Sequence, residues 1–175
     1  AEVNQYSYQF IDEDGTVLKE ATVDYGSEII APENPSKDAT QEYTYTFAYW
    51  DGFTEGMKQK AEIMIFKAVY SSAINQYTYK FIDEDGRELK SETVNYGTEI
   101  IPPENPSKAS TDKYSYIFKG WNEYEDGMII TDNITFTAEY TAEINKYTFK
   151  FIDYDGTVIK EATVAYGTVI PLPAA

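Results

Sequence analysis

A ten-residue motif, Tyr-x-Tyr-x-Phe-Ile-Asp-x-Asp-Gly, occurs three times in this sequence and constrains the fold more than any other feature. It spans residues 6–15, 77–86 and 147–156, with Phe149 in place of the second Tyr in the third occurrence. The occurrences begin 71 and 70 residues apart. Alternating aromatic residues that run into an Asp-Gly turn are typical of a β-hairpin. A unit that returns at such an interval predicts a tandem repeat protein.

The similarity between the repeats extends well beyond this motif. Residues 4–26 and 75–97 are identical at 16 of 23 positions. The sequence Pro-Glu-Asn-Pro-Ser-Lys recurs unchanged at residues 32–37 and 103–108, and Trp50 corresponds to Trp121. This level of agreement indicates an internal duplication.

We therefore divide the chain into three repeats. The first covers residues 1–71, the second covers 72–141, and the third, 142–175, is truncated after its first hairpin. Half a sheet cannot enclose a core, so we expect the segment to come from a longer natural chain. We expect the third repeat to be partly disordered, to dock as a cap, or to pair with another molecule through an exposed strand edge. The link from Tyr70 to Tyr77 is short and lacks Gly and Pro, which predicts a stiff rod.

The residue types predict a mainly β fold made of tandem small sheet domains. Tyr, Thr, Ile, Val and Phe crowd the strand-like runs, whereas Gly and Pro fall between them. Each complete repeat is predicted to contain about four mostly antiparallel strands. In the first repeat these are residues 5–12, a strand that begins at residue 16, and residues 44–50 and 63–70. No segment has the period of a long helix, and residues 36–41 allow at most one short helical turn.

The side-chain pattern distinguishes two possible turns in the first hairpin. A two-residue Asp-Gly loop would pair Phe10 with Lys19. A three-residue Glu-Asp-Gly loop, with Gly15 in the left-handed conformation of a G1 bulge, would pair Phe10 with Leu18 instead. Position 18 is apolar in all three repeats, as Leu18, Leu89 and Ile159. We therefore predict the three-residue loop, with Leu18 on the core face.

Val23 does not fit the alternation that this pairing implies. Counting from Leu18, Val23 would fall on the outer face, although it is apolar. We therefore predict a bulge or a strand end near Thr22.

The charge of the chain excludes several classes of function. The chain has 14 Lys+Arg and 30 Asp+Glu, a formal net charge of −16, and it has no His and no Cys. An excess of negative charge repels nucleic acid and anionic lipid, so neither is an expected partner. We expect no membrane insertion, because no apolar run approaches the length of a membrane span, and no signal peptide opens the segment. Disulfides and thiolate sites are excluded by the absence of Cys.

The order of these motifs resembles that of a known family, the Listeria–Bacteroides repeat, or B-repeat of internalins. The resemblance is best in the second repeat, with Phe-Lys-Gly-Trp at residues 118–121 and Asp-Asn-Ile-Thr-Phe-Thr-Ala-Glu-Tyr at 132–140. The first repeat departs from the pattern, because Tyr49 replaces the Gly before the Trp and Ile-Met-Ile-Phe at 63–66 replaces a polar approach to the last strand. The front hairpin alone also resembles mucin-binding-type repeats.

This resemblance implies both a fold and a setting. It implies a small β-grasp-like sheet domain, strung in tandem on secreted, wall-attached proteins of largely Gram-positive bacteria. The implied role is that of a spacer, a stalk or a weak adhesion module. The implied location is therefore extracellular and attached to the cell wall.

The paired aspartates of the three turns are the first candidates for chemistry. Two carboxylates at this spacing can serve as a general acid and base. They can also brace a turn, because Asp side chains accept hydrogen bonds from nearby backbone amides. Three tandem copies favour the structural role. We therefore assign to the turns Asp12, Asp14, Gly15, Asp83, Asp85, Gly86, Asp153, Asp155 and Gly156.

The same aspartates invite a calcium interpretation, which an EF-hand does not satisfy. Aligning Asp12, Asp14 and Gly15 with the calcium loop places Phe10 at its first ligand position and Ala21 at its twelfth. The EF-hand is therefore rejected, whereas looser calcium binding by acidic loops stays open. No cofactor is expected.

Four aromatic residues are candidates for ligand binding. Trp50 and Trp121 lie at equivalent strand ends, where an indole can stack on a sugar or close a core, and we favour the core. Tyr154 replaces a Glu at a hairpin tip that should face water. Tyr124 and Tyr154 are the two side chains that we retain as binding candidates.

Lys19, Lys90 and Lys160 recur beside core positions and raise the question of an intramolecular isopeptide bond. Strand alternation predicts that these lysines point outward as solvated charges. An intact mass that lacks one ammonia or water would support the covalent bond.

Two functions of different classes follow from these features. The first is a non-catalytic, acidic spacer in a bacterial surface protein, whose partners are the other domains of a longer chain. The second is an adhesion module that recognises a host protein or a glycan through loop aromatics or strand edges. Self-association through the truncated third repeat is also possible. An enzyme is disfavoured, because His and Cys are absent and each carboxylate pair has a turn explanation.

Overall fold

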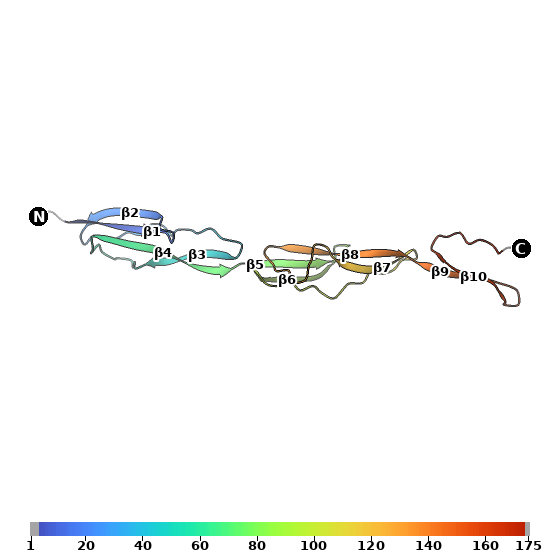
Figure 1. The fold of residues 1–175 in the computed structure, drawn as a ribbon. Helices are drawn as coiled ribbons and strands as arrows, with labels where there is room; N and C mark the ends of the chain where they lie inside the picture. The colour runs from blue at the N-terminus through green and yellow to red at the C-terminus, as the bar shows by residue number, and fades with distance from the viewer. Residues whose placement is uncertain (1–3, 174–175) are drawn as a thin grey trace. The chain divides into compact units, whose positions relative to one another are not determined.

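The computed structural model of this protein describes residues 4–173 and contains ten β-strands in that part of the chain (Figure 1). No helix occurs among these residues, and residues 36–41, where a helical turn was allowed, form an irregular connection. The strands are β1 (Gln5–Ile11), β2 (Val17–Asp24), β3 (Tyr43–Asp51), β4 (Ile63–Ile74), β5 (Gln76–Ile82), β6 (Glu88–Asn95), β7 (Tyr114–Trp121), β8 (Ile134–Ile144), β9 (Lys146–Ile152) and β10 (Val158–Ala165).

The strands form two four-stranded sheets and one two-stranded sheet. The four-stranded sheets have the orders β2-β1-β4-β3 and β6-β5-β8-β7, and β9 pairs with β10. In each large sheet the first and last strands of the repeat run parallel, with Phe10 opposite Phe66 and Phe81 opposite Phe136. The pairs β1–β2, β3–β4, β7–β8 and β9–β10 are antiparallel. The predicted class of tandem small β-grasp-like domains is therefore confirmed, and each complete sheet is mixed.

The chain divides into two compact units, Ala1–Gln76 and Tyr77–Ala175. The first unit contains the first four-stranded sheet, and the second contains the other four-stranded sheet and the β9–β10 hairpin. Strands β4 and β8 continue to Ile74 and Ile144, past residues 71 and 141. They do so because the antiparallel pairing with β3 and β7 continues to these residues.

A small aromatic core lies on one face of each large sheet. In the first unit Phe10 is fully buried, and its ring centroid lies 4.9 Å from those of Trp50 and Phe66. Phe81, Trp121 and Phe136 repeat this arrangement in the second unit, at 4.8 and 4.9 Å. The Phe–Trp pairs are edge-to-face, whereas the Phe–Phe pairs are tilted or stacked, and such aromatic packing adds to the stabilisation that burial provides.

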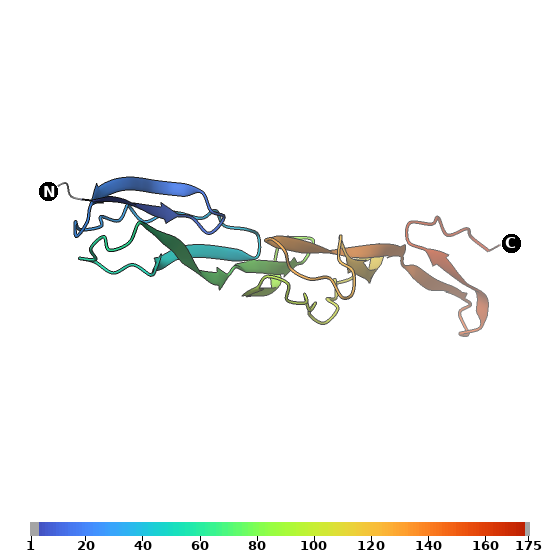
Figure 2. The same cartoon turned by 60° about the vertical axis from the view of Figure 1, so that its left-hand side comes forward.

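The connections between strands cover this face and exclude water from the core. Ile29 and Ile100, which follow the first hairpin of each repeat, are buried in the core. Isolated bridges join Glu28 to Lys58 and Glu99 to Ile129. The Pro-containing connection and the loop after the Trp strand therefore lie over the same side of the sheet, as Figure 2 lets the reader follow.

The hairpin register differs from the predicted one. Phe10 pairs with Lys19, whereas Ile11 pairs with Val17, so Leu18 is the extra residue of a β-bulge. Leu18 is 40% exposed and Ile159 is 57% exposed, so the placement of this position in the core was wrong. Its apolar character misled the prediction, because a bulged residue leaves the alternation of its strand.

The length of the loop and the position of Val23 both agree with this register. Asp12 N donates to Thr16 O, and Gly15 has a φ of +91°, so Glu13, Asp14 and Gly15 form a three-residue loop. From Lys19 onward the pairing is regular, and Val23 faces the core opposite Tyr6. The break in alternation therefore lies at Leu18 and not near Thr22, where the sequence suggested it.

Candidate functional site

The acidic turns are held by contacts that differ for the two aspartates. Asp12 Oδ1 accepts hydrogen bonds from Glu13 N and from the Tyr70 hydroxyl, both at 2.8 Å. Asp14 Oδ1 accepts a hydrogen bond from Thr16 N at 2.9 Å. The first aspartate therefore ties the hairpin to β4, whereas the second acts within the turn.

The second repeat contains the same turn with one additional ion pair. Asp83 Oδ1 accepts hydrogen bonds from the Tyr140 hydroxyl at 2.9 Å and from Glu84 N at 3.0 Å. Its other oxygen, Oδ2, lies 3.0 Å from Nη2 of Arg87, which replaces Thr16. Asp85 Oδ1 accepts a hydrogen bond from Arg87 N at 2.9 Å.

These contacts raise the pKa of the two tyrosines and lower the pKa of Asp14 and Asp83. Burial and the hydrogen bond to Asp12 raise the pKa of Tyr70 to about 12, and burial with Asp83 does the same for Tyr140. Burial disfavours the Asp83 carboxylate, but the hydrogen bonds from Tyr140 and Arg87 outweigh it and lower the Asp83 pKa. The hydrogen bond from Thr16 N lowers the pKa of Asp14. The carboxylates are thus held ionised and the tyrosines neutral.

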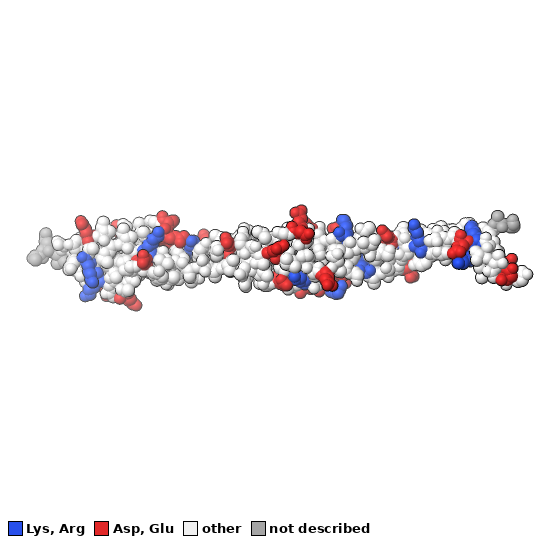
Figure 3. Space-filling view, turned by 60° about the horizontal axis from the view of Figure 1, so that its bottom comes forward, with Lys and Arg blue, Asp and Glu red and all other residues white. Residues whose placement is uncertain are grey.

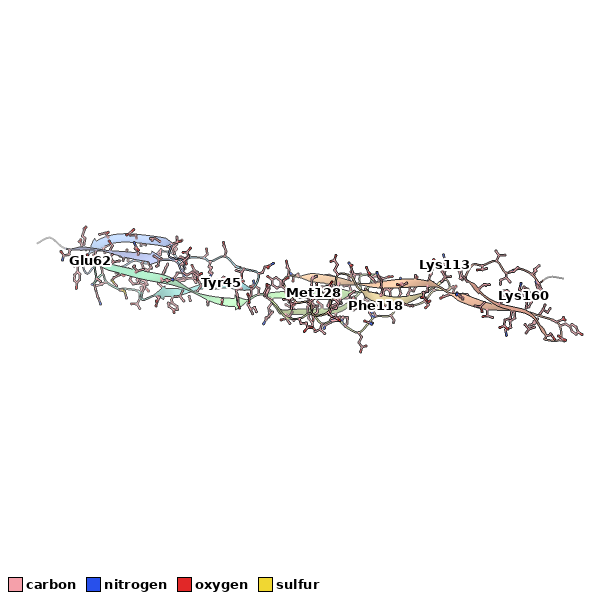
Figure 4. All side chains as sticks on the ribbon, viewed as in Figure 1. Tyr45, Glu62, Lys113, Phe118, Met128 and Lys160 are labelled. Carbon is pink, nitrogen blue, oxygen red and sulfur yellow. The ribbon has the colours of Figure 1, made fainter. Side chains whose placement is uncertain are left out.

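Beside each of the first two turns lies a lysine that contacts both an acidic and an aromatic side chain. This contact was not predicted from the sequence. Lys37 pairs with Glu13, and its Nζ lies 3.9 Å from the centre of the Tyr45 ring (labelled in Figure 4). Lys108 pairs with Glu84 and lies 4.0 Å from the centre of the Tyr116 ring. The sequence did contain a signal for this contact, because each Lys follows its Glu by the same 24 residues.

The third turn has the same local geometry. Asp153 Oδ1 accepts a hydrogen bond from Tyr154 N at 2.7 Å, and Asp155 Oδ1 accepts one from Thr157 N at 2.9 Å. The bond from Thr157 N lowers the pKa of Asp155. Tyr154 lies at the tip of this hairpin, with 98% of its surface exposed.

Part of the hydrogen-bonding capacity of the paired aspartates is already used within the domain. One oxygen of Asp12 and one of Asp14 already accept backbone or tyrosine hydrogen bonds. Within residues 4–173 no three Asp or Glu side chains gather closely enough to hold a metal ion. The three tips belong to separate hairpins, each with its own hydrogen bonds.

A second candidate site is a hollow beside the tryptophan, which occurs at equivalent positions in both complete repeats. In the second repeat it measures about 530 Å³ and includes Asn105, Trp121, Tyr124 and Asp126 in its lining. In the first it measures about 350 Å³, and the equivalent lining residues are Asn34, Trp50, Phe53 and Glu55. Both volumes lie in the range typical of small-ligand sites.

The hollow combines aromatic and polar groups. Trp50 is only 5% exposed, and its indole Nε1 is buried without a hydrogen-bond acceptor among the described residues. Tyr124 packs edge-on against Phe81 and Phe136, and its hydroxyl donates to Ile100 O at 3.2 Å. Both aromatic side chains therefore belong to the core wall of the hollow, and Tyr124 is not a free loop residue.

The three recurrent lysines do not simply face solvent, as strand alternation suggested. Lys19 Nζ donates to Ile30 O at 2.7 Å, and Lys90 Nζ donates to Ile101 O at 2.8 Å. In the third repeat Lys160 Nζ lies 3.5 Å from Pro171 O. Because bulge residue 18 shifts the register, these ammonium groups reach the Pro-containing connection and hold it by hydrogen bonds.

The fold and these recurring turns define a class, a tandem of small, mixed-sheet repeat domains. A family profile described as the Listeria-Bacteroides repeat domain matches residues 6–65 and 77–145. The matches cover most of the chain, so this chain belongs to the Listeria–Bacteroides repeat family. It consists of tandem repeat domains of a family that occurs in bacterial surface proteins, in agreement with the expectation from the motifs.

Two curated relatives come from Evansella cellulosilytica. One, named as a Gly-rich membrane protein, is 28% identical over 98% of this chain, and the other, named as a membrane protein, is 29% identical over 89% of it. The aligned regions make up 20% and 23% of those proteins, so this chain spans about a fifth of their length.

Two solved structures share similarity at low sequence identity. Domains 3–4 of Streptococcal High Identity Repeats in Tandem (SHIRT), from a cell surface protein, are 16% identical with a TM-score of 0.34, covering 80% of this chain and 99% of that chain. Mub-RV is 10% identical with a TM-score of 0.26, covering 79% of this chain and 98% of that chain. Among residues 4–173 there is no helix that would be able to span a lipid bilayer.

Proposed function

We propose that this chain is a non-catalytic spacer segment of a bacterial cell-surface protein, which holds another domain of a longer chain away from the cell wall. The family assignment and the names of two relatives as membrane proteins support this setting. The partners are then the neighbouring domains of the same polypeptide.

The observation that carries the proposal is the length of the connection between repeats. A single residue separates β4 from β5, and a single residue separates β8 from β9. These residues are Asn75 and Asn145. A connection this short leaves few backbone torsions free, which favours a stiff array.

Each of these asparagines is held by the loop that precedes the third strand of a repeat. In the first unit Asn75 N donates to Glu42 O at 2.8 Å, and its Nδ2 donates to Thr40 O and Gln41 O at 2.8 and 3.0 Å. In the second unit Asn145 makes the equivalent bonds to residues 111–113. Each asparagine is thus the single residue between the last strand of one repeat and the first strand of the next. Its hydrogen bonds hold this connection to the loop before the third strand.

The charge of the chain supports the same role. A formal net charge of −16 favours solubility and disfavours contact with other acidic surfaces. On the face drawn in Figure 3, both acidic and basic side chains occur among uncharged ones. Such a surface suits a spacer that other acidic surfaces repel.

A distance measurement between two labels tests the spacer role. The chain has no Cys, so Ser36→Cys and Ser107→Cys place labels at equivalent exposed positions of the two complete repeats. We expect a single narrow distance distribution by pulsed electron spin resonance. A flexible Gly-Ser insertion after Asn75 is the matched control and should broaden it. A native chain as broad as the control would contradict the proposal.

A second function, adhesion, is favoured by the hollow that recurs beside Trp50 and Trp121. A hollow with an aromatic wall, an Asn amide and a carboxylate at its rim suits a polyhydroxylated ligand such as a saccharide. A protein partner pairing with the open edge of β9 is an additional route, since β9 pairs only with β10 among the described strands. That edge would also allow self-association through the third repeat.

Titration with neutral oligosaccharides, followed by amide chemical shifts, tests the adhesion function. Adhesion predicts saturable shifts at Asn105 and Asp126 that disappear in an Asn105→Ala/Asp126→Ala variant. The matched control is Ser107→Ala, an exposed change in the same connection outside the lining. Shifts that are absent or insensitive to the lining variant would leave the spacer role alone.

A further inference from the structure

The outer face of the first sheet, opposite its core, carries an exposed apolar stripe. Phe66 is buried, so Ile65 and Lys67 on either side of it point to the other face. Ile63, Ile65 and Tyr49 are 62%, 55% and 57% exposed. Tyr49 pairs with Val69 across β3 and β4, which extends the stripe along the sheet. We call the exposed apolar residues Tyr49, Ile63 and Ile65, together with the half-buried Val69 and the exposed Lys67, the outer stripe.

The second repeat shows that the fold does not require this stripe. Its cores and strand order match those of the first repeat, but Thr135 stands at the position of Ile65 and Glu139 at that of Val69. Gly120 replaces Tyr49. Exposed apolar side chains that one copy of a scaffold retains and the other lacks indicate a contact surface.

The stripe also contains an exposed pair of opposite charges. Asp51 and Lys67 are cross-strand neighbours in β3 and β4, and both are exposed. Neither forms an ion pair with another side chain within residues 4–173. The equivalent residues of the second repeat are Asn122 and Thr137, so this pair too is specific to the first repeat.

The arrangement of these charges fits a second copy of the same surface. In a two-fold symmetric contact the same patch meets itself, so Lys67 of one copy lies toward Asp51 of the other, and Asp51 toward Lys67. Apolar side chains then pack between the sheets, whose faces pair at a spacing of about 10 Å. The net charge of −16 that each copy carries opposes this contact, so the apolar side chains and the two opposite-charge pairs have to outweigh it.

We propose that the outer stripe of the first repeat is a self-association surface that binds the same stripe of a second copy of this chain. The association is driven by apolar burial and opposed by the net charge of the two copies. Because salt screens that long-range repulsion, the dimer strengthens as ionic strength rises. This proposal does not depend on the spacer role.

Sedimentation equilibrium of the whole chain tests the proposal. The wild type is expected to dimerise in a concentration-dependent manner, more tightly in high salt. The variant Ile65→Thr/Val69→Glu, which installs the residues of the second repeat, should weaken the dimer by at least about tenfold. The reciprocal change Thr135→Ile/Glu139→Val is the matched control for folding and general hydrophobicity, assessed by the thermal midpoint of each variant.

A charge reversal distinguishes a symmetric contact from nonspecific hydrophobic association. Lys67→Asp alone and Asp51→Lys alone should each weaken the dimer, because like charges then meet across the axis. The double variant Asp51→Lys/Lys67→Asp should restore it. A wild type that stays monomeric at all concentrations overturns the proposal. A dimer that ignores Ile65→Thr/Val69→Glu, as expected for pairing through β9, also overturns it.

Discussion

The Tyr70 hydroxyl donates a 2.8 Å hydrogen bond to Asp12 Oδ1, across 58 residues of sequence. The equivalent bond joins Tyr140 to Asp83 at 2.9 Å. In each complete repeat this contact fastens the tip of the first hairpin to the last strand. An aspartate that the sequence assigns to a local turn therefore also closes the domain.

The first prediction concerns alkaline pH. Tyr70 and Tyr140 have pKa values raised to about 12, so the fold favours their neutral forms. Their contribution to the free energy of unfolding is fully present below the ordinary tyrosine value of 10.0 and is lost as the pH rises through about 12. This loss amounts to at most roughly 3 kcal/mol per repeat. Urea denaturation at increasing pH measures it.

The variant Tyr70→Phe/Tyr140→Phe isolates this contribution. Each repeat should be less stable at neutral pH by about 1–3 kcal/mol, because each loses one bond to a charged carboxylate, and the variant should lose less stability at high pH. Tyr154→Phe is the control, since Tyr154 is 98% exposed at a hairpin tip. Equal alkaline loss in all three proteins would contradict the assignment.

The second prediction concerns acid. The pKa of Asp83 is lowered, so its stabilising contribution is present above the ordinary value of 3.8 and is lost as the pH falls through its lower folded value. Arg87→Thr, which installs the residue of the first repeat, should raise the Asp83 pKa toward its ordinary value. The Arg87 side chain is 62% exposed, so the effect on stability should stay within about 1 kcal/mol.

The carboxyl carbon shift of Asp83, followed by NMR through an acid titration, measures this pKa directly. Lys80→Thr serves as the control, because it breaks the exposed Lys80–Glu88 pair and leaves Asp83 untouched. An Asp83 titration that is the same in Arg87→Thr as in the wild type would show that Arg87 does not stabilise the carboxylate.

The third prediction concerns the asparagine before β9. Asn145→Ala removes the side-chain bonds to Thr111 O and Asp112 O, which join the third hairpin to the second repeat. Amides of β9 and β10 should exchange their hydrogens about tenfold faster or more, while β5 and β8 keep their protection. Hydrogen exchange followed by mass spectrometry measures both.

Asn4→Ala is the matched control for this change. Asn4 occupies the equivalent position before β1, and its side-chain amide is 3.5 Å from the Tyr6 hydroxyl. Its replacement should leave the exchange of β1 and β2 nearly unchanged. Acceleration spread evenly over the whole second unit in Asn145→Ala would show that the bond is not specific to the hairpin.

The fourth prediction concerns calcium. Oxygens of Asp12 and Asp14 already accept hydrogen bonds, and among the described residues no three acidic side chains are arranged to hold a metal ion. Added calcium should therefore shift the thermal midpoint no more than magnesium at equal ionic strength, where only screening acts. A saturable shift caused by calcium alone, reversed by a chelator, would refute this expectation.

Much of the fold was predictable because it is local and repeated. The alternation of Tyr6, Tyr8 and Phe10 identifies a strand and its buried face, and the Asp-Gly sequence identifies the turn. The interval of 71 and 70 residues identifies the tandem arrangement without any knowledge of contacts. Tyr124, which was retained as a binding candidate from the sequence, packs on Phe81 instead. The two residues are far apart in the sequence, so no local pattern predicts their contact.

The sequence alone therefore determined the repeat, the strand-forming segments and the chemistry of each turn, because these depend on residues close together in the chain. Three features are visible in the folded chain alone: the bulge at Leu18, the bond from Tyr70 to Asp12, and the position of Lys37 between Glu13 and Tyr45. Tyr70 reaches Asp12 because β1 pairs in parallel with β4, which is distant in sequence. The bulge in the β1–β2 hairpin and the position of Lys37 depend on how the hairpin and the connection after it pack on the core, and no single segment specifies that packing.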